Sequence, residues 1–243
     1  MNIYFDKMEQ INLDEFEGVI FDLDGVIYDI SEALEKAVED GVEKYKLNIK
    51  IDEVLQEIAH LIEEIQHYPV PQIILESYDL LQVDFLKDLS FFKKLRIAVF
   101  LFNQFNEYRE DSTLFEGIDE VIKELSDEDL KLAILTNNKS AYAEDILEKF
   151  NLTEFFPTII GFNEVSNNKP DPEGLLKILE KWDIKPEEAI FIGDMTTDVQ
   201  AGKAAGVTVI CVASGLAEKQ NLLEEEPDYL VENTEELKTL LDL

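Results

Sequence analysis

Short apolar runs separated by polar segments recur along most of this chain. Runs of the kind that form buried strands occupy residues 18–21, 132–135, 158–161, 189–192, 207–212 and 229–231. Between them, apolar residues recur at helical spacing in residues 118–125, 140–150, 172–182 and 197–205. Ser140 is a predicted N-cap, and Pro172 suits the first turn of a helix. Strands that alternate with helices predict an α/β fold, with a doubly wound, mostly parallel sheet covered by helices on both faces.

The pattern changes between residues 30 and 110. Apolar residues there recur at helical spacing, as at Ala33, Leu34 and Ala37, and a strand pattern is missing. We therefore predict an all-α helical-bundle cap domain at residues 30–110, inserted into an α/β catalytic core made of residues 1–29 and 111–243. Five phenylalanines are expected to fill the interior of the cap from one helical face, with a few rings exposed, rather than to line an aromatic pocket: Phe91, Phe92, Phe100, Phe102 and Phe105.

Four polar clusters punctuate the predicted core. They are Asp22-Leu23-Asp24-Gly25, Thr136-Asn137-Asn138, Lys169-Pro170-Asp171-Pro172 and Gly193-Asp194-Met195-Thr196-Thr197-Asp198. Three of the four directly follow a predicted strand. Open parallel sheets bind their ligands at the carboxyl ends of the strands, which all lie at one edge. We therefore expect the clusters to converge there into a single site.

The acidic residues of these clusters point to a metal ion. Two carboxylates ~4 Å apart repel each other by ~1 kcal/mol in water and ~4 kcal/mol at a protein-like dielectric. Bringing Asp22, Asp24, Asp194 and Asp198 together therefore requires a cation, and hard oxygen ligands suit Mg²⁺. Taken singly, each motif has a plainer explanation. The first could be a turn or the opening of a calcium loop, Asp194 a helix cap, and Asp198 a first-turn acid.

Thr136 and Lys169, each an ordinary loop residue when taken alone, complete a set of groups suited to phosphoryl transfer. A carboxylate can attack phosphorus, and a second carboxyl can protonate the leaving oxygen and then deprotonate water. A lysine and a hydroxyl can hold the phosphoryl oxygens as charge develops. We predict Asp22, Asp24, Thr136 and Lys169 as catalytic residues, with Thr136, Asn137 and Lys169 binding substrate.

The four clusters, in this order, closely resemble the four motifs of the haloacid dehalogenase superfamily, in the helical-cap subclass that includes phosphoglycolate phosphatases. The resemblance implies that Asp22 is the nucleophile and Asp24 the general acid and base. It implies that Mg²⁺ is held by Asp22, the backbone carbonyl of Asp24, and Asp194. By the same resemblance, Asp198 orients Lys169 or a water bound to the metal.

Relatives with such a cap read their substrates with a loop between cap helices. The candidate loop here covers residues 67–72, and it offers His67, Tyr68 and Gln72 as contacts to the leaving group. A plain interhelical loop is the alternative interpretation.

Asp24 separates the possible activities within the superfamily. Members that cleave carbon–halogen bonds lack the second aspartate, because no alkoxide needs a proton. The expected function is a Mg²⁺-dependent phosphatase, a phosphoric monoester hydrolase, that cleaves a small organic phosphate monoester through an aspartyl-phosphate. A sugar-phosphate mutase resembling β-phosphoglucomutase remains an alternative, and a catalytically silent binding protein is a second one.

Composition limits the classes of molecule that this protein is expected to bind. The formal charge of −33 over 243 residues disfavours nucleic acid and anionic membranes, which repel such a chain at long range. A small phosphorylated metabolite stays compatible, since one cation and one lysine can reverse the local field. No apolar run approaches the ~20 residues of a membrane span, and no secretory signal is visible. Cys211 is the single cysteine, which favours a cytoplasmic location. We also expect a monomer or a homodimer.

Overall fold

A six-stranded parallel sheet forms the centre of the protein. The computed structural model describes residues 10–47, 49–51, 54–55, 89–214 and 217–243. The strand order is β5-β4-β1-β6-β7-β8, and every neighbouring pair is parallel. The strands are β1 (Gly18–Phe21), β4 (Lys131–Leu135), β5 (Thr158–Ile160), β6 (Ala189–Gly193), β7 (Thr208–Val212) and β8 (Tyr229–Val231). All six predicted strands are confirmed, and no end shifts by more than one residue.

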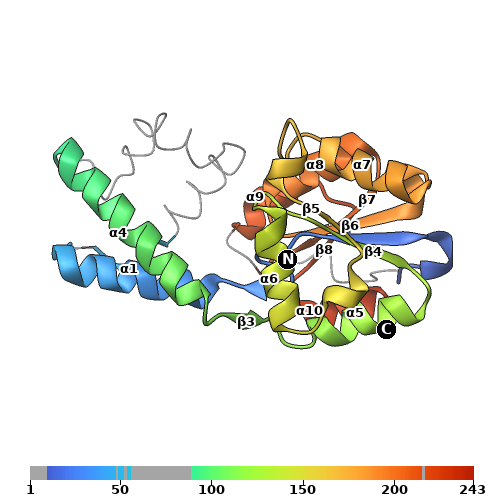
Figure 1. Ribbon diagram of the computed structural model, residues 1–243, viewed down its shortest axis with the longest axis horizontal. Helices are drawn as coiled ribbons and strands as arrows, with labels where there is room; N and C mark the ends of the chain where they lie inside the picture. The colour runs from blue at the N-terminus through green and yellow to red at the C-terminus, as the bar shows by residue number, and fades with distance from the viewer. Residues whose placement is uncertain (1–9, 48, 52–53, 56–88, 215–216) are drawn as a thin grey trace.

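Helices cover both faces of this sheet (Figure 1). One face carries α5 (Ile118–Asp127), α6 (Ser140–Lys149) and α10 (Thr234–Leu240), and the other carries α7 (Glu173–Trp182), α8 (Thr196–Ala205) and α9 (Lys219–Glu224). Successive strand residues point to opposite faces, so Val19 and Phe21 pack into the first layer and Ile20 into the second. The predicted doubly wound α/β core is confirmed.

Local details differ from expectation at the start of α6. Ser140 is the first residue of the helix, and Lys139 occupies the cap position. The predicted N-cap is therefore wrong, because a residue distant in sequence supplies the capping acceptor. The Ser140 N–H donates to Asn163 Oδ1 at 3.0 Å. Within the described ranges, short 3₁₀ helices also occur at η1 (Leu13–Glu15), η4 (Thr153–Phe155), η5 (Phe162–Glu164) and η6 (Pro186–Glu188).

Residues 30–110, called the insert below, contribute α1 (Ser31–Tyr45) and α4 (Phe91–Arg109). The two helices pack against each other to one side of the sheet (Figure 1). Their contact is close at Gly41, where an added Cβ would lie 2.5 Å from Leu101 Cδ2. Phe105 packs against a small apolar cluster that includes Leu34. A few exposed rings were expected among the five phenylalanines, and three of them are exposed: Phe91, Phe92 and Phe102.

The insert leaves and rejoins the core at one place. There, β2 (Tyr28–Asp29) pairs antiparallel with β3 (Thr113–Leu114). Lys149 of α6 donates to the carbonyls of Glu110 (2.6 Å) and Ser112 (3.0 Å), and the Tyr28 hydroxyl donates to the carbonyl of Arg109. These bonds fix the returning segment against the core. The division into a catalytic core and a cap domain stays a prediction.

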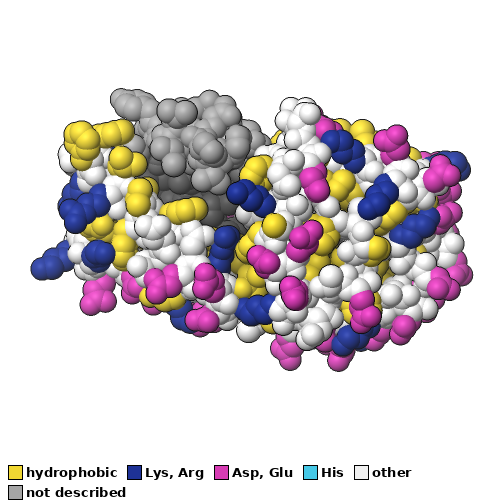
Figure 2. Space-filling view, in the orientation of Figure 1, with side chains coloured by type: hydrophobic (Ala, Val, Ile, Leu, Met, Phe, Trp, Pro, Cys, Tyr) yellow, Lys and Arg dark blue, Asp and Glu magenta, His cyan; other side chains and the backbone are white. Residues whose placement is uncertain are grey.

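The surface of the core is rich in acidic groups. On the face drawn in Figure 2, Asp and Glu side chains are scattered over the core with Lys and Arg between them, so the negative charge is dispersed. In the part of the chain that the structure describes, no helix combines the length and apolar character needed to cross a membrane.

Candidate active site

Three polar clusters meet where the central strands end. Strand β1 lies between β4 and β6, so the residues that follow these strands are neighbours. The Asp22 N–H donates to the Ile192 carbonyl at 2.8 Å, which carries the strand pairing of β1 one residue further. Each of Asp22, Asp194 and Asp198 offers a carboxylate oxygen, and these three oxygens lie within 4.8 Å of one another. The predicted convergence of these acids is therefore present in the structure.

Lys169 brings the third motif into the same cluster. Its side chain is 3% exposed, and its ammonium lies 2.9 Å from Asp22 Oδ1 and 2.7 Å from Asp198 Oδ1. It also donates to the Leu135 carbonyl at the end of β4, at 3.3 Å. Burial alone would lower the pKa of Lys169, but the carboxylates of Asp198 and Asp22 outweigh it and raise that pKa. The lysine is therefore a fixed positive charge beside Asp22.

A tight turn presents Asp194 to the site. Asp198 Oδ2 accepts hydrogen bonds from the N–H groups of Asp194 (3.1 Å) and Met195 (3.0 Å), so one acid holds the loop that carries the other. Gly25 lies against the Asp194 carboxylate with a φ of +86°, and a Cβ at position 25 would be 2.0 Å from Asp194 Oδ2. Ser214 in turn donates to the Gly25 carbonyl at 3.0 Å. Only glycine fits at this contact.

The electrostatics of the cluster favour a cation. Burial, together with Asp198 and Asp24, raises the pKa of Asp22 to about 7 in spite of Lys169. Burial and the charges of Asp198 and Asp22 raise the pKa of Asp194 well above its usual range. Among the described residues, Asp194 Oδ1 and Thr197 Oγ1 are buried and find no hydrogen-bond partner. The cluster offers oxygen atoms, carries more negative charge than Lys169 neutralises, and includes oxygens without a hydrogen-bond partner. Such a set of ligands fits a hard divalent cation.

Thr136 and Asn137 line the same edge and also organise it. Thr136 is 3% exposed, and its Oγ1 accepts the Asn138 N–H at 3.0 Å, which leaves its own proton available to another acceptor. The Asn137 side chain exchanges two hydrogen bonds with the backbone of Lys169: Nδ2 donates to the carbonyl at 3.3 Å, and Oδ1 accepts the N–H at 3.2 Å. Asn137 thus ties the second motif to the third.

Asp24 lies outside the three-carboxylate group and has partners of its own. Asn138 Nδ2 donates to Asp24 Oδ2 at 2.7 Å, and the Tyr142 hydroxyl donates to Asp24 Oδ1 at 2.9 Å. Burial raises the pKa of Asp24, while Tyr142, Arg109 and Asn138 oppose that rise. Sequence reasoning did not select Asn138 or Tyr142 as site residues. Asn138 is the last residue of the second cluster, and Tyr142 lies in the first turn of α6, four residues later.

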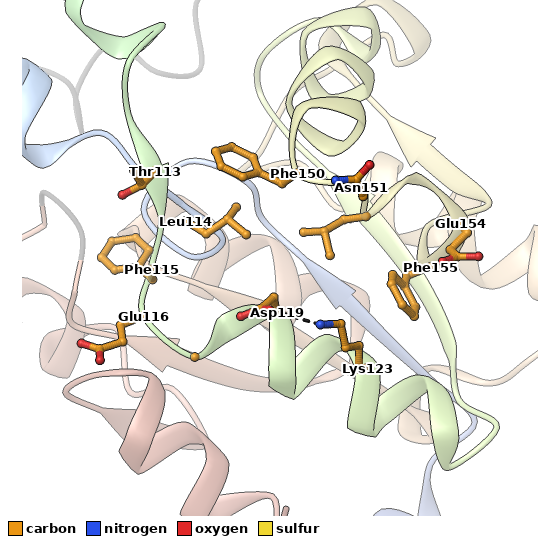
Figure 3. A pocket seen from close by; sticks show the side chains of 12 residues that line it. Thr113, Leu114, Phe115, Glu116, Asp119, Lys123, Phe150, Asn151, Glu154 and Phe155 are labelled. Carbon is orange, nitrogen blue, oxygen red and sulfur yellow. Dashed lines mark hydrogen bonds and ion pairs between the residues drawn. The ribbon is translucent and has the colours of Figure 1, made fainter.

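The proposed cap contacts His67, Tyr68 and Gln72 lie outside the described residues. A separate hollow of about 600 Å³ lies between β3, the start of α5 and the end of α6 (Figure 3). Its wall carries the Asp119–Lys123 ion pair, at 3.2 Å. None of the predicted catalytic or metal-binding residues lines it, so the strand-end cluster is the candidate active site.

Comparison with known families agrees with this geometry. A model described as haloacid dehalogenase-like hydrolase matches residues 19–212, which includes all four motifs. The chain belongs to this family. The resemblance predicted from the motifs is confirmed, and so is the expectation of a hydrolase. As a haloacid dehalogenase-like hydrolase, the chain has the family's fold as well as its motifs.

Individual relatives cover nearly the whole chain. A phosphoglycolate phosphatase of Salmonella choleraesuis is 28% identical over 98% of this chain and 95% of its own. A protein of Caldanaerobacter subterraneus, named as a candidate pyrophosphatase PpaX, is 29% identical over 92% of this chain and 94% of its own. A crystal structure from Thermotoga maritima, named as a candidate beta-phosphoglucomutase, superposes with a TM-score of 0.68 at 24% identity, covering 94% and 100% of the two chains. This last likeness concerns the fold alone.

Proposed function

We propose that this member of the haloacid dehalogenase-like family is a Mg²⁺-dependent phosphatase that hydrolyses a small organic phosphate monoester through an aspartyl-phosphate on Asp22. The observation that carries the proposal is the buried cluster in which Asp22 shares one lysine with Asp198 and lies beside Asp194. A carboxylate flanked by a fixed cation and two further acids suits the capture of a phosphoryl group.

In the first step, an Asp22 oxygen attacks phosphorus and the ester P–O bond breaks. Lys169, held by Asp22, Asp198 and the Leu135 carbonyl, is placed to neutralise charge on the phosphoryl oxygens. The Thr136 hydroxyl accepts a hydrogen bond from Asn138, so its own O–H can donate to one of these oxygens. Because these groups are buried and already bonded in place, little reorganisation is needed when charge develops.

Asp24 handles protons in both halves of the reaction. It gives a proton to the leaving oxygen in the first step, so that an alcohol departs rather than an alkoxide. It then accepts a proton from the water that attacks the aspartyl-phosphate, which releases inorganic phosphate and restores Asp22. Burial raises the pKa of Asp24, which favours the protonated form that the first step requires.

The residues that would hold Mg²⁺ are Asp22, Asp194 and the backbone carbonyl of Asp24. When bound there, a divalent cation supplies charge neutralisation and a fixed orientation for the phosphoryl group. The unpaired Asp194 Oδ1 and the raised pKa values of Asp22 and Asp194 support such a ligand set.

The substrate is proposed to be a small phosphorylated metabolite. The names of the relatives favour phosphoglycolate and, second, inorganic pyrophosphate as compounds to assay. We propose that residues 30–110 form a cap that selects the leaving group through His67, Tyr68 or Gln72. Unchanged kcat/KM for the preferred substrate in Tyr68→Ala and Gln72→Ala would remove that assignment. A cytoplasmic location and a monomer or homodimer remain predictions from the sequence.

The test is a panel of phosphate esters assayed with Mg²⁺ and with EDTA. We expect phosphate release that requires Mg²⁺ and falls on the order of 10⁴-fold or more in Asp22→Asn, because the nucleophile is lost. Asp145→Asn, an exposed acid on α6, is the matched control and should retain activity. Robust turnover in EDTA would contradict the proposal. Interconversion of hexose phosphates without phosphate release would point to the mutase instead.

A further inference from the structure

Two side chains that were not predicted as site residues, Asn138 at the end of the second cluster and Tyr142 beyond it, hold the second aspartate. Asn138 and Tyr142 each donate one hydrogen bond to Asp24, and each bond goes to a different carboxylate oxygen, at 2.7 Å and 2.9 Å. Two donors on two oxygens fix the plane of the carboxyl group as well as its position. A single donor would leave the group free to rotate about its Cβ–Cγ bond.

The Asn138 donor is itself fixed at both ends of its backbone. Its N–H donates to Thr136 Oγ1 at 3.0 Å, and its carbonyl accepts the N–H of Phe162 at 2.9 Å. It is thereby bound to the end of β4 and to the turn after β5. The amide that reaches Asp24 therefore extends from a rigid loop, as accurate placement of a reacting group requires.

The Tyr142 donor is fixed by the insert. Arg109, the last residue of α4, places its guanidinium 4.4 Å from the centroid of the Tyr142 ring. The Arg109 carbonyl accepts a hydrogen bond from the buried Tyr28, so this arginine is bound to the core as well. Cation–π contact over a partly buried ring stabilises its orientation. A connection of direct contacts therefore runs from the insert through Arg109 and Tyr142 to Asp24.

We propose that Tyr142 and Asn138 are positioning residues that aim the Asp24 carboxyl at the leaving oxygen, and that Arg109 holds Tyr142 in the orientation this requires. The inference rests on the proposed phosphatase function, because it assigns a role to the proton that Asp24 delivers. In the step concerned, the bond from phosphorus to the leaving oxygen breaks while the Asp24 proton passes to that oxygen, and no other reactant is needed.

The role predicts a dependence on the leaving group. An alkyl leaving group needs a proton because an alkoxide is a poor leaving group, whereas p-nitrophenolate departs without one. A variant that misaims Asp24 should lose kcat/KM for an alkyl ester and keep most of it for p-nitrophenyl phosphate. A general structural defect would lower both by the same factor.

The experiment measures kcat/KM for p-nitrophenyl phosphate and for the best alkyl ester of the panel in Tyr142→Phe, Asn138→Ala and Arg109→Ala. We expect about a tenfold loss on the alkyl ester for the first two, a smaller loss for the third, and about twofold or less on the aryl ester for all of them. Tyr108→Phe and Asn106→Ala are matched controls in the insert. They remove a hydroxyl that bonds Asp40 and an amide that bonds the Phe102 carbonyl, and they should change neither value.

A second measurement separates positioning from folding. If Tyr142 acts through Asp24, Tyr142→Phe should cause no further loss of kcat/KM in an Asp24→Asn background. Losses that are equal on both esters, absent on both, or fully additive with Asp24→Asn would overturn the inference and leave the phosphatase function intact. A wild-type protein that releases phosphate from no ester overturns both.

Discussion

The strand-end site and the insert are built on opposite principles. At the site, Lys169 and three carboxylates are almost fully buried and hold one another through ion pairs and backbone hydrogen bonds. In the insert, α1 and α4 meet through apolar side chains, and large rings such as Phe92 (80% exposed) face outward. At the site, each position requires one particular type of amino acid. In the insert, the pattern of apolar positions can be met by many different apolar residues.

The sharpest way to test this contrast is a pair of glycine substitutions. Gly25 and Gly117 have nearly equal φ values of +86° and +79°, so alanine costs each about 1–2 kcal/mol of backbone strain. Only at Gly25 would the new Cβ displace a site carboxylate, 2.0 Å away; at Gly117 the nearest atom is Thr234 Cγ2 at 3.9 Å. We expect Gly25→Ala to lower kcat/KM at least ~10²-fold and to weaken Mg²⁺ binding, measured by calorimetry, while Gly117→Ala keeps both. Similar activities in the two variants would break the comparison.

A second pair compares the two kinds of core. Leu34 (7% exposed) lies between the helices of the insert, and Leu175 (0% exposed) lies between α7 and the sheet. Each change to alanine should cost about 2–5 kcal/mol locally. We expect Leu175→Ala to lower the midpoint of global unfolding. Leu34→Ala should instead raise hydrogen exchange in α1 and α4 and leave the strands protected. Loss of protection throughout the sheet in Leu34→Ala would show that the insert and the core unfold together.

The charged cluster should also respond to pH and cations in a way that an apolar region cannot. The pKa of Asp22 rises from 3.8 to about 7 in the folded chain. The folded state therefore binds more protons between these values, and the contribution of Asp22 to stability falls as pH rises through that range. Mg²⁺ selects the ionised carboxylates, so it should raise the melting temperature more at pH 8 than at pH 5. Melting curves in EDTA and in Mg²⁺ test this, and equal increments at the two pH values would contradict it.

The smallest expected effect concerns the loop that leads to Lys169. The hydrogen bond from Lys177 to Glu173, together with the N–H groups of Ser166 (3.0 Å) and Asn167 (3.0 Å) that Glu173 accepts, lowers the pKa of Glu173 to about 2. Its contribution to stability is therefore full above pH 4.5 and is lost as pH falls toward 2. Glu173→Gln should be slightly less stable than wild type at pH 7, with the difference vanishing in acid. Glu180→Gln, exposed on the same helix, should show no such trend.

The contrast also explains what could be predicted. Strands β1, β4 and β6 are continuous apolar runs ended by charged or hydroxyl residues, so their positions and the residues of the site were visible together. The cap position of Ser140 was misassigned because Asn163, distant in sequence, supplies the bond. Asn138 and Tyr142 were missed as partners of Asp24 for the same reason: long-range pairing leaves no local pattern. In the insert, periodicity predicted helices but could not tell which rings face solvent.

The connection through β2 and β3 has a further consequence. Each of these strands is two residues long, and they pair with each other, so the chain departs from the core and returns to it at adjacent points. A segment attached in this way can be lengthened, shortened or exchanged without shifting the register of the six parallel strands. If the insert selects the leaving group, as proposed above, the choice of substrate can change while the strand-end acids and Lys169 stay in place, with Arg109 the point where the two regions remain coupled.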